Sequence, residues 1–386
     1  MKQFSISLGK VYGIPISIHW TFWILIVWIV VNGFSAGQSI SQVLWYVLFV
    51  LAIFTCVGLH ELGHALAAKR FDIDTHSITF LPIGGLARLS HIPKNPRQEL
   101  IITIAGPMVN LIIAMILGIV IMLLGNGMAI ITEDTEFVAS INADNFMFML
   151  LTVNISLFIF NMIPAFPMDG GRVFRALLSF RLPRFKATSI AVRTGQAFAI
   201  LFVLLGLLYN PFLIVIAIFI SISAQSELRD IHFSESLIQY KASDLLMQKF
   251  ELFSEDQSLS DAATEIIKGQ DKVFVVKDEF GPTGFFTKND ILKGLSELSQ
   301  KTKLKNIMQT NLQWVKEDQN AAAVWELMKN EKLPILLVGD QDQLRGIINF
   351  ENLQEFIQIS ASQKSFLIKE ENSFHKEWAL NSKSST

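Results

Sequence analysis

Five consecutive residues, His60-Glu61-Leu62-Gly63-His64, have the types and spacing of a metal site. Positions i and i+4 of a helix lie on the same face, so His60 and His64 can direct two imidazoles at one ion. Glu61 is then placed to hold a water molecule beside that ion, and the ligand types suit zinc. The motif predicts zinc-assisted hydrolysis with Glu61 as the base. The alternative is two histidines that bond across helices, with Glu61 as an interfacial carboxylate.

A catalytic zinc needs a third protein ligand and one exchangeable water. His76 and His91 lie in the loop after the motif, so the better candidate is Asp169. Pro164 and Pro167 interrupt the helix before it, and the two glycines after it allow a sharp turn. Irregular backbone at membrane depth is tolerated only beside a buried or wet cavity. We therefore expect Asp169 on irregular chain near the histidines; a helix-ending turn with a solvated carboxylate is the alternative.

The chain that positions these residues divides into an apolar and a polar part. Of its 386 residues, 51% are hydrophobic and 17% charged, whereas soluble domains carry about a quarter charged residues. Only 22 charged side chains precede position 226, and 44 fall in the last 161 residues. Because a bilayer core excludes unpaired charge, residues 1–225 are expected in a lipid bilayer and the remainder in water.

Net charge and cysteine content exclude other classes of protein. A formal net charge of −2 is unsuited to nucleic-acid binding, which needs clustered basic side chains, so no nucleic-acid partner is expected. Cys56 is the single cysteine, which excludes intrachain disulfides and zinc sites built from several cysteines. Cys56 lies four residues before His60, where a thiolate ligand is conceivable, but a small buried core residue is the expected role.

Six apolar stretches approach the roughly 20 residues that a helix needs to cross a bilayer. They run over 16–31, 43–68, 101–124, 146–163, 190–208 and 211–223. The last is short, so five spans with one kinked element stay open as an alternative. A cleaved signal peptide at the first stretch is a further alternative that its length disfavours.

Positive charge orients these stretches, because Lys and Arg accumulate in short cytosolic loops. Such residues precede the first stretch and follow the second and the fourth; those after the fourth are Arg172, Arg175, Arg181, Arg184 and Lys186. The alternation predicts a multi-pass protein of the cell (inner) membrane with both termini cytoplasmic.

Several motifs together resemble the site-2 protease family of intramembrane zinc metalloproteases. The resemblance covers roughly residues 1–225 and is carried by HELGH at 60–64, Asn161-x-x-Pro164 and Asp169-Gly170. Ala105-Gly106-Pro107-x-x-Asn110 and Gly84-Gly85 are also similar to that family.

The resemblance implies a reaction and the residues that carry it. His60, His64 and Asp169 would be the ligands of one zinc ion, and Glu61 would be the catalytic base. The zinc would polarise the scissile carbonyl and lower the pKa of its water toward 7. Glu61 would take the proton of that water and pass it to the leaving amine, so that a peptide bond in a transmembrane protein substrate is hydrolysed.

Two further features concern substrate binding. Residues 78–89, reading ITFLPIGGLARL, predict a hairpin with a turn at Gly84-Gly85. In the resembled family such a sheet can pair with an unwound substrate, which supplies hydrogen bonds that the extended helix has lost; an ordinary interfacial hairpin is the alternative. Asn161 could bond backbone freed by Pro164 or hold the substrate strand, and the sequence leaves both open.

The polar part contains a repeat with an offset of 62 residues. Glu255-Asp256-Gln257 returns as Glu317-Asp318-Gln319, and Gly284 returns as Gly346. Such a period indicates two copies of one supersecondary unit. Each copy predicts a helix (260–268 and 321–330), two strands (273–277 and 284–287; 335–338 and 346–349) and a closing helix. The copies resemble a tandem pair of cystathionine-β-synthase-type domains, at 241–300 and 301–360.

Pairs of that kind often bind adenosine nucleotides through a Thr and an Asp after the last strand. Thr287 and Asp290 match this pattern, but Asn349 and Asn352 stand at the corresponding positions of the second copy. The resemblance therefore implies at most one ATP or AMP site, and a homodimer formed through the pair. A pair that only dimerises or contacts the membrane domain is the alternative.

The sequence thus predicts a polytopic α-helical membrane protein of about six spans with a cytosolic α/β tandem-repeat regulatory domain. The expected segments are the membrane protease domain (1–225), a linker (226–240), the two repeats, and a polar tail (361–386). The leading function is an intramembrane zinc endopeptidase. The alternative is a nucleotide-regulated transporter or channel that uses the His/Glu/Asp cluster as an ion path.

Overall fold

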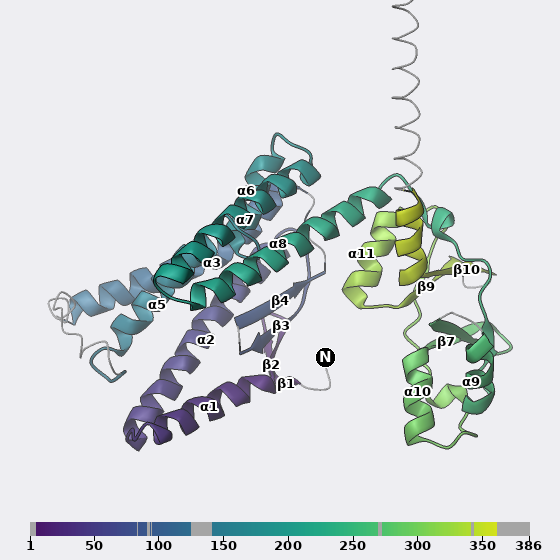
Figure 1. Ribbon diagram of the computed structural model, residues 1–386, viewed down its shortest axis with the longest axis horizontal. Helices are drawn as coiled ribbons and strands as arrows, with labels where there is room; N and C mark the ends of the chain where they lie inside the picture. The colour runs from purple at the N-terminus through teal and green to yellow at the C-terminus, as the bar shows by residue number, and fades with distance from the viewer. Residues whose placement is uncertain are drawn as a thin grey trace, which may run out of the picture. The chain divides into compact units, whose positions relative to one another are not determined.

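The structure is a computed structural model that describes residues 5–82, 84–90, 93, 95–124, 141–268, 272–340 and 343–360. The predicted polar tail and most of the loop after residue 124 lie outside these ranges. The chain divides into two compact units, Met1–Ile231 and His232–Thr386 (Figure 1).

The first unit is a bundle of helices that are apolar except for the amphipathic α6. They are α1 (Thr21–Ser35), α2 (Ile40–Lys69), α3 (Pro96–Leu123), α5 (Phe146–Asn161), α6 (Asp169–Ser179), α7 (Arg184–Leu208) and α8 (Phe212–Leu237). Helix α3 packs against α2, α5 and α6, and α6 packs against α7. The last helix, α8, continues through most of the stretch predicted as a linker.

The predicted helical membrane part is confirmed, but the count of six full spans is not exact. Within the described residues, four helices, α2, α3, α7 and α8, are long and apolar enough to cross a bilayer. Helices α1 and α5 have 15 and 16 residues, which at about 1.5 Å per residue reach less than roughly 30 Å of hydrocarbon. Helices α7 and α8 are separate and pack together through Ala199 and Ala217, so the single kinked element is wrong.

A four-stranded sheet lies beside the helices (Figure 1). Its strands, in spatial order, are β1 (Ser5–Val11), β2 (Ile14–His19), β3 (Thr75–Leu81) and β4 (Gly84–Leu89). Strands β1–β2 and β3–β4 pair antiparallel, and β2–β3 pair parallel with Ile16 opposite Ile78.

The sheet confirms the hairpin at 78–89 and corrects two other predictions. The turn precedes Gly84 and Gly85, which are the first two residues of β4. The first apolar stretch does not begin as a helix at residue 16, because Ile14–His19 is a strand. Its isoleucines alternate with other residues at a period of two, which is the pattern of a strand.

Arg175 differs from the solvated loop cation that the charge count assumes. The cations after the fourth stretch are expected in a cytosolic loop, but Arg175 lies within α6 and its side chain is fully buried. Its guanidinium donates hydrogen bonds to Glu99 of α3 and Glu227 of α8. Counting cations along a sequence cannot distinguish a solvated arginine from one paired inside the protein.

The second unit has the predicted repeat. The first copy contains β5 (Leu252–Ser254), α9 (Leu259–Lys268), β6 (Val273–Lys277), β7 (Pro282–Thr287) and α10 (Lys288–Glu297). The second contains β8 (Trp314–Val315), α11 (Ala321–Glu331), β9 (Ile335–Asp340), β10 (Gln343–Asn349) and a helix at 350–360. In each sheet the short first strand pairs parallel to the middle strand, which pairs antiparallel to the third.

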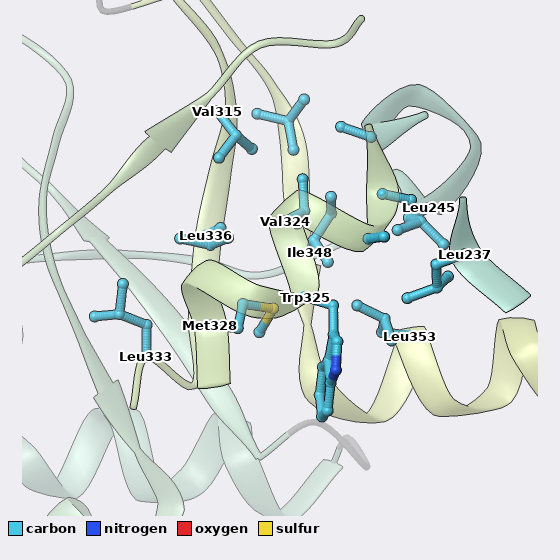
Figure 2. Packing of buried hydrophobic residues seen from close by; sticks show 14 residues of the cluster. Leu237, Leu245, Val315, Val324, Trp325, Met328, Leu333, Leu336, Ile348 and Leu353 are labelled. Carbon is cyan, nitrogen blue, oxygen red and sulfur yellow. The ribbon is translucent and has the colours of Figure 1, made fainter. Parts of the chain in front are cut away.

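Each repeat contains a hydrophobic core, and the core of the second copy also includes Ala242 and Leu245 from the start of the first. Figure 2 shows the core of the second copy, in which Trp325 and Met328 of α11 pack between the sheet and Leu353. In the first copy, Phe253, Phe274 and Phe286 occupy the corresponding interior.

Candidate metal centre

Three side chains from two distant parts of the sequence converge on one point. Asp169 Oδ2 lies 3.2 Å from His60 Nε2 and 3.1 Å from His64 Nε2, and the two Nε2 atoms are 3.1 Å apart. Ligands about 2.0–2.1 Å from a tetrahedral zinc lie roughly 3.3 Å from one another. The triangle therefore has the size of one face of a tetrahedral zinc site.

Two neighbours fix which ring nitrogens carry a proton. The carbonyl of Ile102, which can only accept, lies 2.8 Å from His64 Nδ1, so Nδ1 donates and Nε2 of the neutral ring is bare. Asn110 Oδ1 accepts from His60 Nδ1 at 3.0 Å with the same consequence. Two Nε2 lone pairs and a carboxylate oxygen thus face one another. A cation between these three electron-rich atoms removes their mutual electrostatic repulsion, so the donor set fits a zinc ion.

One face of α3 organises both histidines. Ile102 and Asn110 bond their rings, and Gly106 between them lies directly behind the ring of His64. A Cβ at Gly106 would stand 2.2 Å from His64 Nε2, so no larger residue fits there. Gly63 of α2 likewise touches the carbonyl of Ala105, which lets the two helices approach closely. The Ala105-Gly106-Pro107-x-x-Asn110 motif of α3 therefore holds the two histidine rings in place.

Asp169 is held by a compact turn and the start of α6. The prediction that it lies on irregular chain is wrong by one residue, because the irregular part ends at Met168 and Asp169 is the first residue of the helix. A carboxylate is favourable at a helix N-terminus. A Cβ at Gly170 would stand 2.3 Å from the carbonyl oxygen of Ile163, so the turn can close over the helix only with glycine there.

Glu61 points toward the sheet from the turn of α2 that carries the histidines. Its Oε2 accepts a hydrogen bond of 3.1 Å from the backbone amide of Ala87 in β4. A Cβ at Gly85 would stand 2.7 Å from Glu61 Cγ, so this glycine leaves the space that the side chain occupies. Strand β4 ends the order of its sheet, so among the described residues no strand covers its outer edge.

The remaining residues singled out in the sequence have simpler positions. Asn161 is the last residue of α5, and Pro164 lies in the turn that follows, so neither alternative for Asn161 is decided. Cys56 is buried one turn before His60, as a core residue would be, and the amide of Asn154 donates to its sulfur at 3.4 Å.

In the second unit, Thr287 and Asp290 lie together at the start of α10. The Thr287 amide and hydroxyl donate to Asp290 Oδ2 at 2.8 and 2.7 Å, and the Asp290 amide donates to Thr287 Oγ1 at 3.2 Å. This is a capping box, which by itself stabilises a helix start. Gln309 Nε2 donates to the same carboxylate oxygen at 3.1 Å.

The comparisons with known proteins now place this geometry in a family. Residues 48–202 match the family described as Peptidase family M50, and residues 242–297 and 304–358 each match the CBS domain. A zinc metalloprotease of Methanocaldococcus jannaschii is 37% identical over 267 residues, which cover 69% of this chain and 73% of the relative. The chain belongs to peptidase family M50.

Further similarities extend over much of this M50 peptidase. A relative from Synechocystis sp. is 26% identical over 382 residues, covering 93% of this chain and 97% of its own. Among solved structures, the Site-2 Protease from Methanocaldococcus jannaschii is 36% identical in sequence. It covers 58% of this chain and 95% of that chain, with a TM-score of 0.42.

Family membership settles the class of protein. The resemblance to site-2 proteases is confirmed, and the chain is a zinc metalloprotease whose apolar helices place it in a membrane, with a tandem CBS pair. The family implies a zinc ion, and His60, His64 and Asp169 are the group that could hold it among the described residues. The transporter or channel alternative is not supported.

Asn110→Leu is expected to weaken zinc binding about 10- to 100-fold, because outer partners that orient ligating histidines typically contribute that much. Leucine has nearly the same size but cannot hold the His60 ring. Zinc affinity of the purified protein is measured by competition with a chromophoric chelator. Asn154→Leu, another buried asparagine that bonds Cys56 rather than a histidine, is the control, and equal affinities in both variants would contradict the assignment.

Proposed function

We propose that the protein is an intramembrane zinc endopeptidase in which His60, His64 and Asp169 hold the zinc and Glu61 is the general base. The observation that carries this proposal is the convergence of three ligand atoms within 3.2 Å, with both histidine tautomers set to present bare Nε2 atoms. Glu61 belongs to the same helical turn, and its carboxylate accepts a hydrogen bond from Ala87 of β4.

The chemistry follows from these positions. A zinc ion held by His60, His64 and Asp169 would lower the pKa of its water toward about 7 and polarise the scissile carbonyl. Glu61 accepts the proton of the attacking water and delivers it to the leaving amine, which divides one peptide bond into an acid and an amine. Its Oε2 accepts a hydrogen bond from the Ala87 amide, which holds the carboxylate beside β4.

The substrate is a transmembrane protein, and we assign the outer edge of β4 to its binding. A helix satisfies its peptide groups internally, so a scissile segment must unwind before a nucleophile reaches it. An uncovered strand edge offers backbone partners to the unwound segment. Gly84 and Gly85 are the first two residues of this strand, and Gly85 lies next to Glu61. Asn161, the last residue of α5, and Pro164, in the turn that leads to Asp169, are also assigned to the substrate.

The membrane arrangement is part of the proposal. Cations before the first stretch and after the second favour a multi-pass protein of the cell (inner) membrane with both termini cytoplasmic. We assign the membrane protease to 1–225, the linker to 226–240, the two repeats to 241–300 and 301–360, and the tail to 361–386. The repeat pair is expected to associate into a homodimer.

The class of activity is tested with purified protein in liposomes. The proposal expects one tightly bound zinc per chain, cleavage of single-span reporter proteins, and no ion flux. Removing zinc with a chelator stops cleavage, and adding zinc restores it. Ion flux that persists without zinc, together with the absence of cleavage, would support a transporter and contradict the protease.

Adenine nucleotide is proposed to bind at Thr287 and Asp290 and to modulate cleavage. The three donors described above all reach Asp290 Oδ2, and we assign the other carboxylate oxygen to the ribose hydroxyls. The Thr287 hydroxyl is assigned to phosphate, toward which its O–H turns from Asp290 Oδ2 when nucleotide binds. This assignment rests on the pattern of residues, since the capping box alone also explains their contacts.

Calorimetry with ATP and with AMP tests the nucleotide site. The wild-type protein is expected to bind at least one of them, and Asp290→Ala to abolish binding. Asn352→Ala, at the corresponding position of the second repeat, is the matched control and is expected to bind like the wild type. No heat from either nucleotide with the wild type would contradict the proposal.

A further inference from the structure

The membrane unit contains a buried ion cluster that the proposed chemistry does not use. Arg175 is 0% and Glu99 4% exposed. Arg175 Nε donates to Glu99 Oε1 at 2.9 Å, Nη2 bonds the same oxygen, and Nη1 bonds Glu227. Arg184 Nη2 lies 4.0 Å from Glu99 Oε2. Buried ion pairs lose hydration, and apolar residues of similar volume often stabilise a fold as well or better, so stability is a weak reason for this cluster.

The cluster continues the face of α3 that organises the histidines. Glu99, Ile102, Gly106 and Asn110 follow one another at spacings of three, four and four residues, which places them along one stripe of the helix. Ile102 and Asn110 orient the two histidines. Glu99, at the start of the stripe, holds Arg175 of α6, the helix that begins with Asp169. One face of α3 thereby locates both halves of the metal site.

Arg175 also holds the turn before Asp169. Its guanidinium carbon lies 5.1 Å from the centroid of the Phe166 ring, and that ring is 1% exposed. Phe166 belongs to the turn that leads into α6, where Gly171 packs against the backbone of Ala165 and Phe166. Arg175 therefore contacts the turn before Asp169 and the helix α3 at the same time.

We propose that Arg175 is a positioning residue that sets Asp169 at the correct distance from His60 and His64. The inference rests on the proposed function, because it assumes that these three residues hold the metal. Metal sites require placement of their ligands within about 0.5 Å, and the groups behind the ligands provide it. The planar guanidinium suits this role because it binds Glu99 through two nitrogens and stacks on Phe166 at once.

Arg175→Lys is the test, because lysine keeps the positive charge but lacks the planar guanidinium that bonds Glu99 through two nitrogens. Binding of Co²⁺ alone to the metal-free protein is followed by its visible absorption, and cleavage of a single-span reporter by kcat and KM. The proposal expects Co²⁺ affinity about 10- to 100-fold weaker, a shifted cobalt spectrum, and kcat lowered about 10²-fold with KM unchanged. Arg181→Lys, an exposed arginine just beyond the same helix, is expected to match the wild type.

Other outcomes separate the possibilities. A folded Arg175→Lys protein with lower thermal stability but wild-type cobalt affinity, spectrum and kcat shows a merely structural role and overturns the inference. Should that variant not fold, Glu99→Gln takes its place, with weaker Co²⁺ binding expected and unchanged binding overturning the inference. If the wild-type protein binds no metal and cleaves nothing, the proposed function is wrong. If the wild-type protein binds metal and cleaves, and the variants do so equally well, only the positioning role of Arg175 is wrong.

Discussion

Glu61→Gln is expected to lower cleavage by roughly 10²- to 10⁴-fold, the usual contribution of a general base, while one zinc per chain stays bound. Glutamine has the size of glutamate and can still contact the Ala87 amide region of β4, but it cannot accept a proton at neutral pH. The ligand atoms of His60, His64 and Asp169 are untouched. The measurement pairs metal content with the cleavage rate of a single-span reporter.

Asp74→Asn is the matched control for that substitution. Asp74 is an exposed acidic residue five positions beyond α2, so the loss of its charge is expected to leave cleavage unchanged. In cells, Glu61→Gln is expected to accumulate uncleaved membrane stubs, and proteomics of these stubs identifies the substrate. Full cleavage by Glu61→Gln would show that another group is the base.

Asp169→Asn is expected to lose both tightly bound zinc and cleavage. The variant replaces an anionic ligand oxygen with a neutral amide at the third corner of the site. The loss of zinc affinity should exceed the roughly 10- to 100-fold that outer partners contribute. Metal affinity is measured by chelator competition, and the cleavage rate is followed as free zinc is raised.

Added zinc distinguishes the two substitutions. Excess zinc is expected to restore part of the cleavage in Asp169→Asn, because its defect is occupancy of the site. It is expected to restore none in Glu61→Gln, whose site is already filled. Asp169→Asn that retains wild-type zinc affinity would remove Asp169 from the ligand set.

The convergence of His60, His64 and Asp169 was largely predictable because each part lies in a short motif with one structural meaning. An i, i+4 histidine pair can face one ion only on a helix, and α2 has that helix. The prolines before Asp169 predict a break in the helix. The structure has this break, and it ends at Met168, one residue earlier than expected. The repeat was equally readable, since the offset of 62 residues relates β6 to β9 and α9 to α11.

The supports of the site were not predictable from the same patterns. Asn110 bonds His60 across 50 positions, and Arg175 meets Glu99 across 76. Such pairs depend on how α3 packs against α2 and α6. A short stretch of sequence carries no information about that packing. The β1–β2 hairpin is not predicted for a related reason. The isoleucines of Ile14–His19 continue directly into the apolar stretch that follows, so they look like the start of a helix.

X-ray absorption at the zinc K edge of the purified wild-type protein tests the central claim most directly. The account predicts one zinc per chain, with two imidazole nitrogens at about 2.0–2.1 Å and the remaining ligands oxygen at about 2.0–2.2 Å. A protein without tightly held zinc, or a spectrum showing a sulfur ligand at about 2.3 Å, would contradict it. The second result would instead point to Cys56, the single cysteine of the chain.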